Sequence, residues 1–278
     1  MEYKSIEIAC DSTFTDIIIA ELSELGFDSF LEHDNGLEAS CTTDLYNESL
    51  VKETFERYKD IFEFSYAEKE VSKINWNQEW EKNYDPITIN NDIYVRATFH
   101  PSRKEEFTYE IVIDPKMSFG TGHHATTSMM LQNQLTLDHS QKKVWDAGTG
   151  TGILAIMAKM LGAQSVEAND IDEWCIENSK ENFALNNYSD IQIHLGAVAE
   201  LEFTPKANDI VLANINKNVL LLEMPQYAEL CKENGYLVLS GFYESDLKDI
   251  EAKANEYGFK LINYKTQNNW CSPVFIKN

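Results

Sequence analysis

The sequence predicts an α/β protein in which a small α+β domain precedes a doubly wound, mostly parallel sheet of seven strands, the last of them antiparallel. Three observations support this prediction. Apolar strand patterns alternate with helical patterns in the second half of the chain, which is typical of a parallel sheet covered by helices. A glycine-rich turn at 146–152 separates one such strand from the helix that follows it. The first 70 residues have a different order, β-α-β-β-α-β.

The first 70 residues are expected to form one small domain. Their pattern predicts a strand at 6–10, a helix at 13–25, a hairpin over 27–41, a helix at 44–58 and a strand at 61–66. The turn Asp34-Asn35-Gly36 has the chemistry of a tight hairpin. This order is that of a ferredoxin-like domain. We therefore divide the chain into a ferredoxin-like domain (1–70), a linker (71–83) and a larger domain (84–278).

The linker carries two tryptophans, Trp76 and Trp80, in a charged stretch. Four residues apart, they would share one face of a helix. Two interpretations stay open: the pair packs the linker against one of the domains, or it forms either a hinge or a surface that contacts a peptide. A hinge would let the first domain reorient toward several target sites.

The larger domain is expected to begin with strands at 87–99 and 107–114. A loop rich in Gly, Thr and His follows and leads into a helix at 127–135, and functional residues concentrate in such loops. Further strands are expected around 144–145 and at 165–170, 191–195, 209–215 and 235–241, helices at 153–161, 172–186, 219–232 and 245–257, and a terminal hairpin at 259–264 and 273–277.

The turn at 146–152 is the most informative stretch. Gly148, Gly150 and Gly152 let the backbone turn sharply and approach a ligand closely. The helix after them would aim free backbone N–H groups at that ligand. Asp170 ends the next expected strand about 20 residues later, where a carboxylate can accept hydrogen bonds from a ribose diol. A purely structural turn would explain the glycines, but not their combination with Asp146 and Asp170.

Two ligands fit this turn. The stretch 150–155 matches the G-x-G-x-x-A of a dinucleotide site. The stretch 146–152 instead resembles the D-x-G-x-G-x-G signature of class I methyltransferases, whose ligand S-adenosylmethionine has a ribose and an adenine but no pyrophosphate. The expected antiparallel last strand fits the methyltransferase variant of the sheet better.

Charge and composition restrict the function further. A net charge of −23 repels nucleic acid, so we expect no direct contact with RNA or DNA. Residues 1–82 hold 20 Asp and Glu against 7 Lys and Arg, which favours a basic partner, although solubility alone would also explain the excess. No apolar run approaches the ~20 residues of a membrane span, and no secretory signal is recognisable. The 5 scattered cysteines indicate free thiols and a cytoplasmic protein.

Adjacent His123 and His124 invite a metal-site hypothesis. No Cys or carboxylate lies at ligand spacing from them, and adjacent histidines usually diverge. We therefore expect them to form hydrogen bonds within the loop, and we expect no metal.

The stretch 119–127, F-G-T-G-H-H-A-T-T, resembles the F-G-T-G-x-H-x-T-T motif of the bacterial ribosomal protein L11 methyltransferase family. The resemblance covers most of the chain and is strong from about Trp76 to the end. It implies an acidic cytosolic enzyme that uses S-adenosylmethionine to methylate lysine side chains of ribosomal protein L11, with the N-terminal amine as a further candidate. It also implies a small recognition domain joined to a class I catalytic domain. We expect a monomer.

The resemblance also implies site residues. We predict cofactor contacts from Phe119, Thr127, Asp146, Gly148, Gly150, Gly152, Asp170 and Asn214. Among these, Asp170 would bind the ribose hydroxyls and Asn214 would lie near the methyl group. Three alternatives stay open: Thr127 and its neighbour Thr126 cap a helix, Asn214 is a strand-end turn residue, and Phe119 packs in the core.

Methyl transfer from a sulfonium needs alignment more than covalent help. A lysine amine must first lose its proton, which costs roughly 4.6 kcal/mol at pH 7 for a pKa ≈ 10.4, and a desolvating pocket lowers that cost. We therefore expect no dedicated strong base and predict that Asn214, with nearby carbonyls, orients the neutral amine. The residues after Asn214 lack the Pro-Pro-aromatic run of adenine-base methyltransferases, which argues against a nucleic-acid base as substrate.

Two other functions stay open on the sequence alone. The first is an NAD-dependent oxidoreductase that uses the turn at 150–155. The second is a non-catalytic ribosome-assembly factor that retains the fold. Binding of S-adenosylmethionine or NADH would separate the first from a methyltransferase, and a methyl-transfer assay would separate the second.

Overall fold

The computed structural model describes residues 3–33, 35–69, 84–114, 120 and 122–278. The chain divides into two compact units, 1–83 and 84–278. Each unit has a buried hydrophobic core of its own. Trp76, Trp80 and Phe119, which carry predictions from the sequence, lie outside the described residues.

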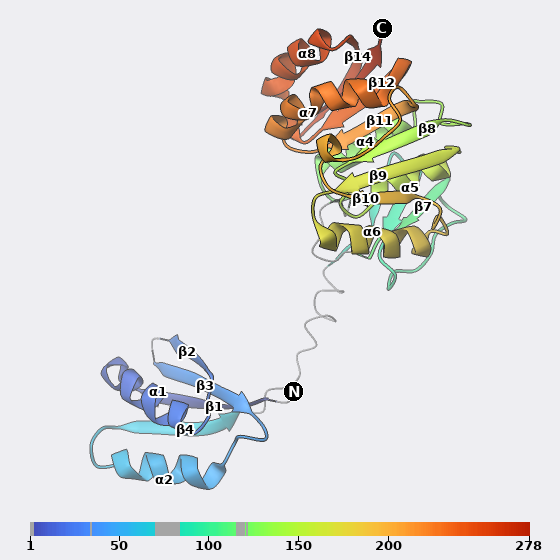
Figure 1. The fold of residues 1–278 in the computed structure, drawn as a ribbon. Coiled ribbons are helices and arrows are strands. Elements are labelled where there is room, and N and C mark those ends of the chain that lie inside the picture. The colour runs from blue at the N-terminus through green and yellow to red at the C-terminus, as the bar shows by residue number, and fades with distance from the viewer. Residues whose placement is uncertain (1–2, 34, 70–83, 115–119, 121) are drawn as a thin grey trace. The chain divides into compact units, whose positions relative to one another are not determined.

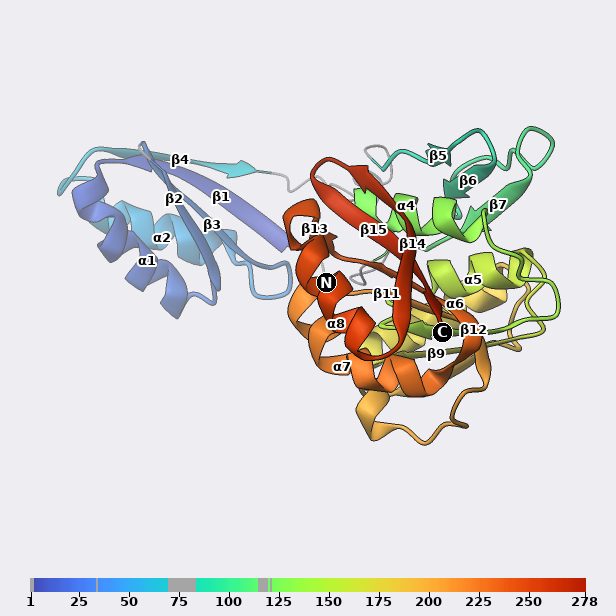
Figure 2. The same cartoon turned by 90° about the horizontal axis from the view of Figure 1, so that it is seen from above.

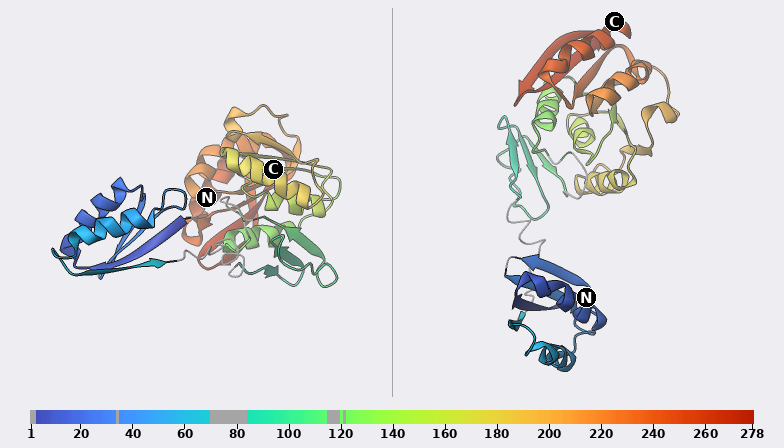
Figure 3. Two further views of the ribbon diagram at one scale, coloured as in Figure 1. Left: turned by 90° about the horizontal axis from the view of Figure 1, so that it is seen from below. Right: turned by 90° about the vertical axis from the view of Figure 1, so that its left-hand side faces the viewer.

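The first unit is an antiparallel sheet with two helices on one face (Figures 1 and 3). Its elements are β1 (Tyr3–Cys10), α1 (Thr15–Glu24), β2 (Ser29–His33), β3 (Gly36–Thr42), α2 (Glu48–Tyr58) and β4 (Phe64–Lys69). The strand order is β2-β3-β1-β4, and every pairing is antiparallel. Ile8 of β1 packs with Leu22 of α1 and Phe55 of α2. The order of elements is the one that the sequence predicts.

Helices α1 and α2 and strands β2 and β4 all start later than the sequence predicts, and the shift is largest for α2 and β4. Helix α2 begins at Glu48 instead of residue 44, because the Asn47 side chain accepts hydrogen bonds from two backbone N–H groups of its first turn. Strand β4 begins at Phe64 instead of residue 61, because a hydrogen-bonded turn follows α2 at 58–62.

The second unit is built on one large, mostly parallel sheet (Figure 1). Its strands are β8 (Lys143–Ala147), β9 (Ser165–Asp170), β10 (Gln192–Leu195), β11 (Asn208–Asn214), β12 (Cys231–Ser240), β13 (Phe242–Tyr243), β14 (Phe259–Gln267) and β15 (Trp270–Lys277). The order is β10-β9-β8-β11-β12-β15-β13, and β14 pairs with β15. Strand order reverses between β8 and β11, and ligands of such sheets bind outside the strand ends at this point.

The last strand, β15, runs antiparallel to β12, as predicted. Within the described residues the sheet contains eight strands instead of the predicted seven. The additional strand is β13, whose Phe242 and Tyr243 pair with Cys271 and Trp270 of β15. A two-residue strand directly after the bend at Gly241 leaves no alternating pattern in the sequence, which is why the prediction missed it.

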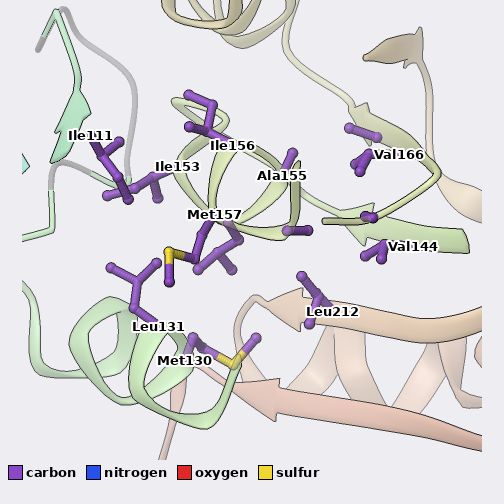
Figure 4. Packing of buried hydrophobic residues seen from close by; sticks show 14 of the residues in the cluster. Ile111, Met130, Leu131, Val144, Ile153, Ala155, Ile156, Met157, Val166 and Leu212 are labelled. Atoms are coloured by element: carbon purple, nitrogen blue, oxygen red, sulfur yellow. The ribbon is translucent and has the colours of Figure 1, made fainter. Parts of the chain in front are cut away.

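Helices cover both faces of the large sheet. α4 (Ala125–Gln134), α5 (Ile153–Met160) and α6 (Glu173–Leu185) lie on one face, and α7 (Lys217–Leu230) and α8 (Leu247–Glu256) lie on the other. Figure 4 shows Leu131 of α4, Met157 of α5 and Leu212 of β11 in the core of the first face. No helix in the described part of the chain combines the length and the apolar character that crossing a bilayer requires.

A small second sheet lies beside α4 and α5 (Figure 2). It consists of β5 (Ile87–Ile89), β6 (Ile93–Arg96) and β7 (Tyr109–Val112). The prediction of one strand over 87–99 is therefore wrong. Asn90 and Asn91 adopt left-handed φ angles of 52° and 62° and turn the chain back between β5 and β6. Asparagine tolerates this conformation better than most residues do.

Candidate active site

The glycine turn connects β8 to α5 in three left-handed steps. Gly148, Gly150 and Gly152 have φ angles of 65°, 57° and 83°. A Cβ atom at Gly148 would lie 2.7 Å from Cδ1 of Ile215, and one at Gly152 would lie 2.4 Å from the ring of Phe183. All three glycines are required for the backbone conformation, and Gly148 and Gly152 also for close packing.

We expect Gly152→Ala to lower the free energy of unfolding by about 2–5 kcal/mol, because a positive φ costs roughly 1–2 kcal/mol and overpacking about 1–3 kcal/mol. Gly162→Ala is the matched control. Its φ is 96°, but the nearest atom to the added Cβ is 3.7 Å away. Gly162→Ala should therefore lose only the stability that a non-glycine residue loses at a positive φ angle. Urea unfolding of both variants measures the difference, and equal losses would contradict the clash with Phe183.

Asp146 lies beneath the turn. Its side chain is fully buried, and its carboxylate accepts a hydrogen bond of 2.6 Å from the Thr149 hydroxyl. Burial raises the pKa of the Asp146 carboxyl to about 7; the hydrogen bonds from Thr149 and from the N–H of Ala155 oppose this rise, and the charge of Asp170 adds to it. The hydrogen bond between Asp146 and Thr149 therefore stabilises the conformation of the turn.

The raised pKa predicts a pH-dependent stability. Between pH 4 and pH 7, Asp146 is ionised in the unfolded chain but keeps its proton in the folded protein. The free energy of unfolding is therefore highest near pH 4 and falls as the pH rises toward 7. We expect the stability of the wild type relative to Asp146→Asn to fall by about 4 kcal/mol at most between pH 4 and pH 8. Chemical unfolding of both proteins across this range measures the difference. A stability difference between the two proteins that stays constant across this pH range would contradict the raised pKa of Asp146.

Asp170 stands at the carboxyl end of β9, beside the turn. One carboxylate oxygen accepts the N–H of Gly150 at 2.9 Å, and the other accepts the N–H of Asp172 at 3.1 Å. These bonds fix the carboxylate in one orientation with its outer edge toward the cavity described below. Each oxygen has a second lone pair available for a further donor.

The Gly- and Thr-rich loop is tied to the turn. The hydroxyl of Thr151 donates a 2.6 Å hydrogen bond to the carbonyl of Gly120. His124 caps α4, because its ring nitrogen accepts the N–H of Thr126. The capping role left open for the two threonines therefore belongs to His124. The ring of His123 lies 3.0 Å from the carbonyl oxygen of Asp85.

Thr127 is fully buried and contacts Asn214 from the end of β11. The side-chain amide of Asn214 donates a 3.3 Å hydrogen bond to the Thr127 hydroxyl. This bond leaves Oδ1 of Asn214 buried and without a hydrogen-bond partner in the described part of the protein. A buried acceptor without a partner is costly, so a ligand that donates a hydrogen bond here would bind favourably.

A cavity of about 600 Å³ opens at the carboxyl ends of the parallel strands. This volume is in the range of small-ligand pockets. Its walls include Gly120, His124, Thr126, Thr127, Gly148, Thr149, Gly150, Asp170, Ile171, Ala197, Asn214, Ile215, Asn216, Val219, Glu223, Gly241 and Trp270. Five predicted site residues thus share one cavity: Thr127, Gly148, Gly150, Asp170 and Asn214. Asp146 and Gly152 lie behind its walls.

Several cavity residues escaped the sequence analysis. Ile171 is 76% exposed, and an exposed apolar residue directly after Asp170 is a signal that could have identified it. Trp270 packs edge-on against His124 with ring centroids 4.7 Å apart, and stacks on Tyr243 at 4.3 Å. No local sequence pattern predicts this aromatic cluster, because His124 and Trp270 are far apart in the sequence of the second unit.

The turn fits a nucleoside better than a dinucleotide. A pyrophosphate would have to lie against the N-terminus of α5 near Gly152. Ile153 and Leu154 at the start of α5 line the cavity, but Gly152 does not, and Thr151 is fully buried and bonded to Gly120. The lining also includes Asp170, whose carboxylate suits a ribose diol, the apolar side chain of Ile171, and Asn214. Among the described residues, no group of three His, Cys, Asp or Glu gathers as a metal site would require.

The strand order, the glycine turn after β8 and the cavity at the strand ends define a class I methyltransferase fold. A solved structure described as ribosomal protein L11 methylase from Lactobacillus delbrueckii subsp. bulgaricus has a similar fold, with a TM-score of 0.63 and 29% identity over 70% of this chain and 100% of that chain. Residues 6–278 match the family model "Ribosomal protein L11 methyltransferase (PrmA)", and the chain belongs to this family.

Relatives that carry the description ribosomal protein L11 methyltransferase agree with this membership. The protein from Phocaeicola vulgatus is 41% identical over 269 residues, which cover 96% of this chain and 95% of the relative. The protein from Porphyromonas gingivalis is 39% identical over 277 residues, which cover 99% of this chain and 94% of the relative.

Proposed function

We propose that this protein transfers methyl groups from S-adenosylmethionine to lysine side chains of ribosomal protein L11, with the N-terminal amine of that protein as a further acceptor. The observation that carries the proposal is one cavity lined both by Asp170, a carboxylate suited to a ribose, and by Asn214, whose Oδ1 is buried and has no hydrogen-bond partner among the described residues. Family membership supports methylation of ribosomal protein L11, since the relatives are named for it.

The cavity residues fit the cofactor part by part. Asp170 accepts hydrogen bonds from the ribose hydroxyls, and Ile171 offers an apolar surface to the adenine. Gly148 and Gly150, without side chains, let the amino-acid part of the cofactor approach the backbone. When bound, S-adenosylmethionine supplies an activated methyl group on a sulfonium, so the protein needs chiefly to align the acceptor.

The acceptor amine has to be neutral and correctly oriented. The hydrogen bond between Asn214 and Thr127 sets the side-chain amide so that its oxygen is left to accept an N–H of the amine. His124, Tyr243 and Trp270 form an aromatic cluster with His124 and Trp270 in the cavity wall. Aromatic rings suit the aliphatic stem of lysine, and exclusion of water lowers the cost of removing the ammonium proton.

The N-terminal unit is proposed to recruit the substrate. Residues 1–82 carry an excess of 13 negative charges, counted as 20 Asp and Glu minus 7 Lys and Arg, which attracts a basic protein over a long range. We assign substrate recognition to residues 1–70, a linker to 71–83 and catalysis to 84–278. We further propose that the protein acts as a monomer in the cytoplasm.

Transfer of an isotope-labelled methyl group to purified ribosomal proteins tests the function directly. The expected result is label in ribosomal protein L11 alone, which peptide mapping then assigns to lysines. Cofactor binding without any transfer would support a non-catalytic assembly factor instead. Binding of NADH in place of S-adenosylmethionine, measured by calorimetry, would support the oxidoreductase and end the proposal.

A further inference from the structure

Glu223 of α7 is an acidic residue in the cavity wall with no role in the reaction described above. It is 8% exposed, and its carboxylate Oε2 accepts a 2.8 Å hydrogen bond from the hydroxyl of Tyr227. Within the described residues this is the one hydrogen bond that reaches the carboxylate. A buried carboxylate is stabilised by several hydrogen-bond donors. Because Oε1 receives none from the described residues, it can accept a hydrogen bond from a ligand.

The position of Glu223 identifies the part of the ligand that it faces. Val219 and Glu223, one turn apart on α7, both line the cavity. Helix α7 packs against the short 3-10 helix η2 (Val198–Glu200), which follows directly on Ala197, another cavity residue. Ala197 lies just beyond the end of β10, next to β9 and its Asp170. Glu223 therefore borders the region of the cavity on the β10 side of the ribose site.

The same strand order orients the nucleoside. Base and methionine substituents leave a ribose in opposite directions. The methyl group has to meet the acceptor near Asn214, at the end of β11, while the ribose is held by Asp170 at the end of β9. The adenine then points away from β11, over Ile171 and toward Ala197. The exocyclic amine of adenine is a hydrogen-bond donor, and a carboxylate is an acceptor without a donor of its own.

We propose that Glu223 accepts a hydrogen bond from the exocyclic amine of the cofactor's adenine and selects this base against a hypoxanthine, which carries a carbonyl oxygen at that position. The inference rests on the proposed function, because it takes the ligand to be S-adenosylmethionine. Tyr227 acts as a positioning residue that holds Oε2 and leaves Oε1 for the base. Adenine recognition thus comes from a helix on the second face of the sheet.

Calorimetric titration with S-adenosylhomocysteine and its deaminated analogue S-inosylhomocysteine tests the proposal without any turnover. We expect the wild type to bind the adenine compound about 10–100-fold more tightly, since a hydrogen bond to a charged group is lost and two acceptors oppose each other with the analogue. Glu223→Gln has nearly the same volume, and its amide can donate to the carbonyl oxygen. Its preference should fall to about threefold or reverse.

Two further variants keep the result interpretable. Tyr227→Phe should reduce the preference severalfold, and it serves if Glu223→Gln does not fold. Glu229→Gln, at an exposed position on the same helix, should retain the wild-type preference. An unchanged preference in Glu223→Gln with intact binding overturns the inference alone. A wild type that binds neither compound overturns the proposed function as well.

Discussion

Deletion of residues 1–70 is expected to abolish methylation of ribosomal protein L11 while the affinity for S-adenosylmethionine stays within about threefold. Within the described residues, the cavity is lined by residues of the second unit, and the two core clusters of that unit contain no residue of the first. The truncated protein should therefore fold. Without the acidic unit, the basic substrate loses both long-range attraction and a docking surface. Calorimetry for the cofactor and labelled methyl transfer for the substrate measure the two effects.

A charge variant separates electrostatic attraction from shape. Glu53, Asp60 and Glu63 are exposed residues of the first unit, and their replacement by Gln, Asn and Gln removes three negative charges. We expect kcat/KM to fall severalfold at low salt and to approach the wild-type value at high salt, where screening weakens the attraction in both proteins. Undiminished methylation by the truncated protein would show that substrate recognition lies in the second unit.

Asn214→Ala is expected to reduce kcat for methyl transfer by about 100-fold, the cost of a misplaced acceptor. Replacing Asn214 by alanine removes the buried Oδ1, which has no hydrogen-bond partner in the described part of the chain. It also removes the amide group that donates to Thr127. The affinity for the cofactor should change by no more than about tenfold, because a neutral hydrogen bond contributes roughly 0.5–1.5 kcal/mol. Single-turnover rates at saturating cofactor measure the effect on chemistry.

Two further variants serve as comparisons for Asn214→Ala. Thr127→Val keeps the volume but loses the hydroxyl that orients the Asn214 amide, so kcat should fall to an intermediate value. Asn255→Ala, an exposed position on α8, controls for loss of an amide elsewhere and should be silent. Full turnover by Asn214→Ala with intact cofactor binding would remove Asn214 from the mechanism.

Local chemistry made part of this protein predictable. Glycines at alternate positions require a turn with positive φ wherever the chain folds, and a carboxylate that ends a strand must lie at the carboxyl edge of a parallel sheet. Gly148, Gly150 and Asp170 could therefore be placed together before any fold was known, and they share the cavity. The errors at β5, β6 and β13 arose where an adjacent pair of asparagines or a two-residue strand carries no periodic pattern.

The sequence by itself determined the alternation of strands and helices, the glycine turn and the acidic character of the first unit, because these depend on neighbouring residues and on composition. Only the tertiary structure decided which distant side chains meet. It paired Asn214 with Thr127, brought Trp270 against His124, placed Glu223 in the wall beside Val219, and buried Asp146 behind the turn. These contacts follow from strand order and helix packing, which join segments far apart in the chain and leave no trace in local spacing.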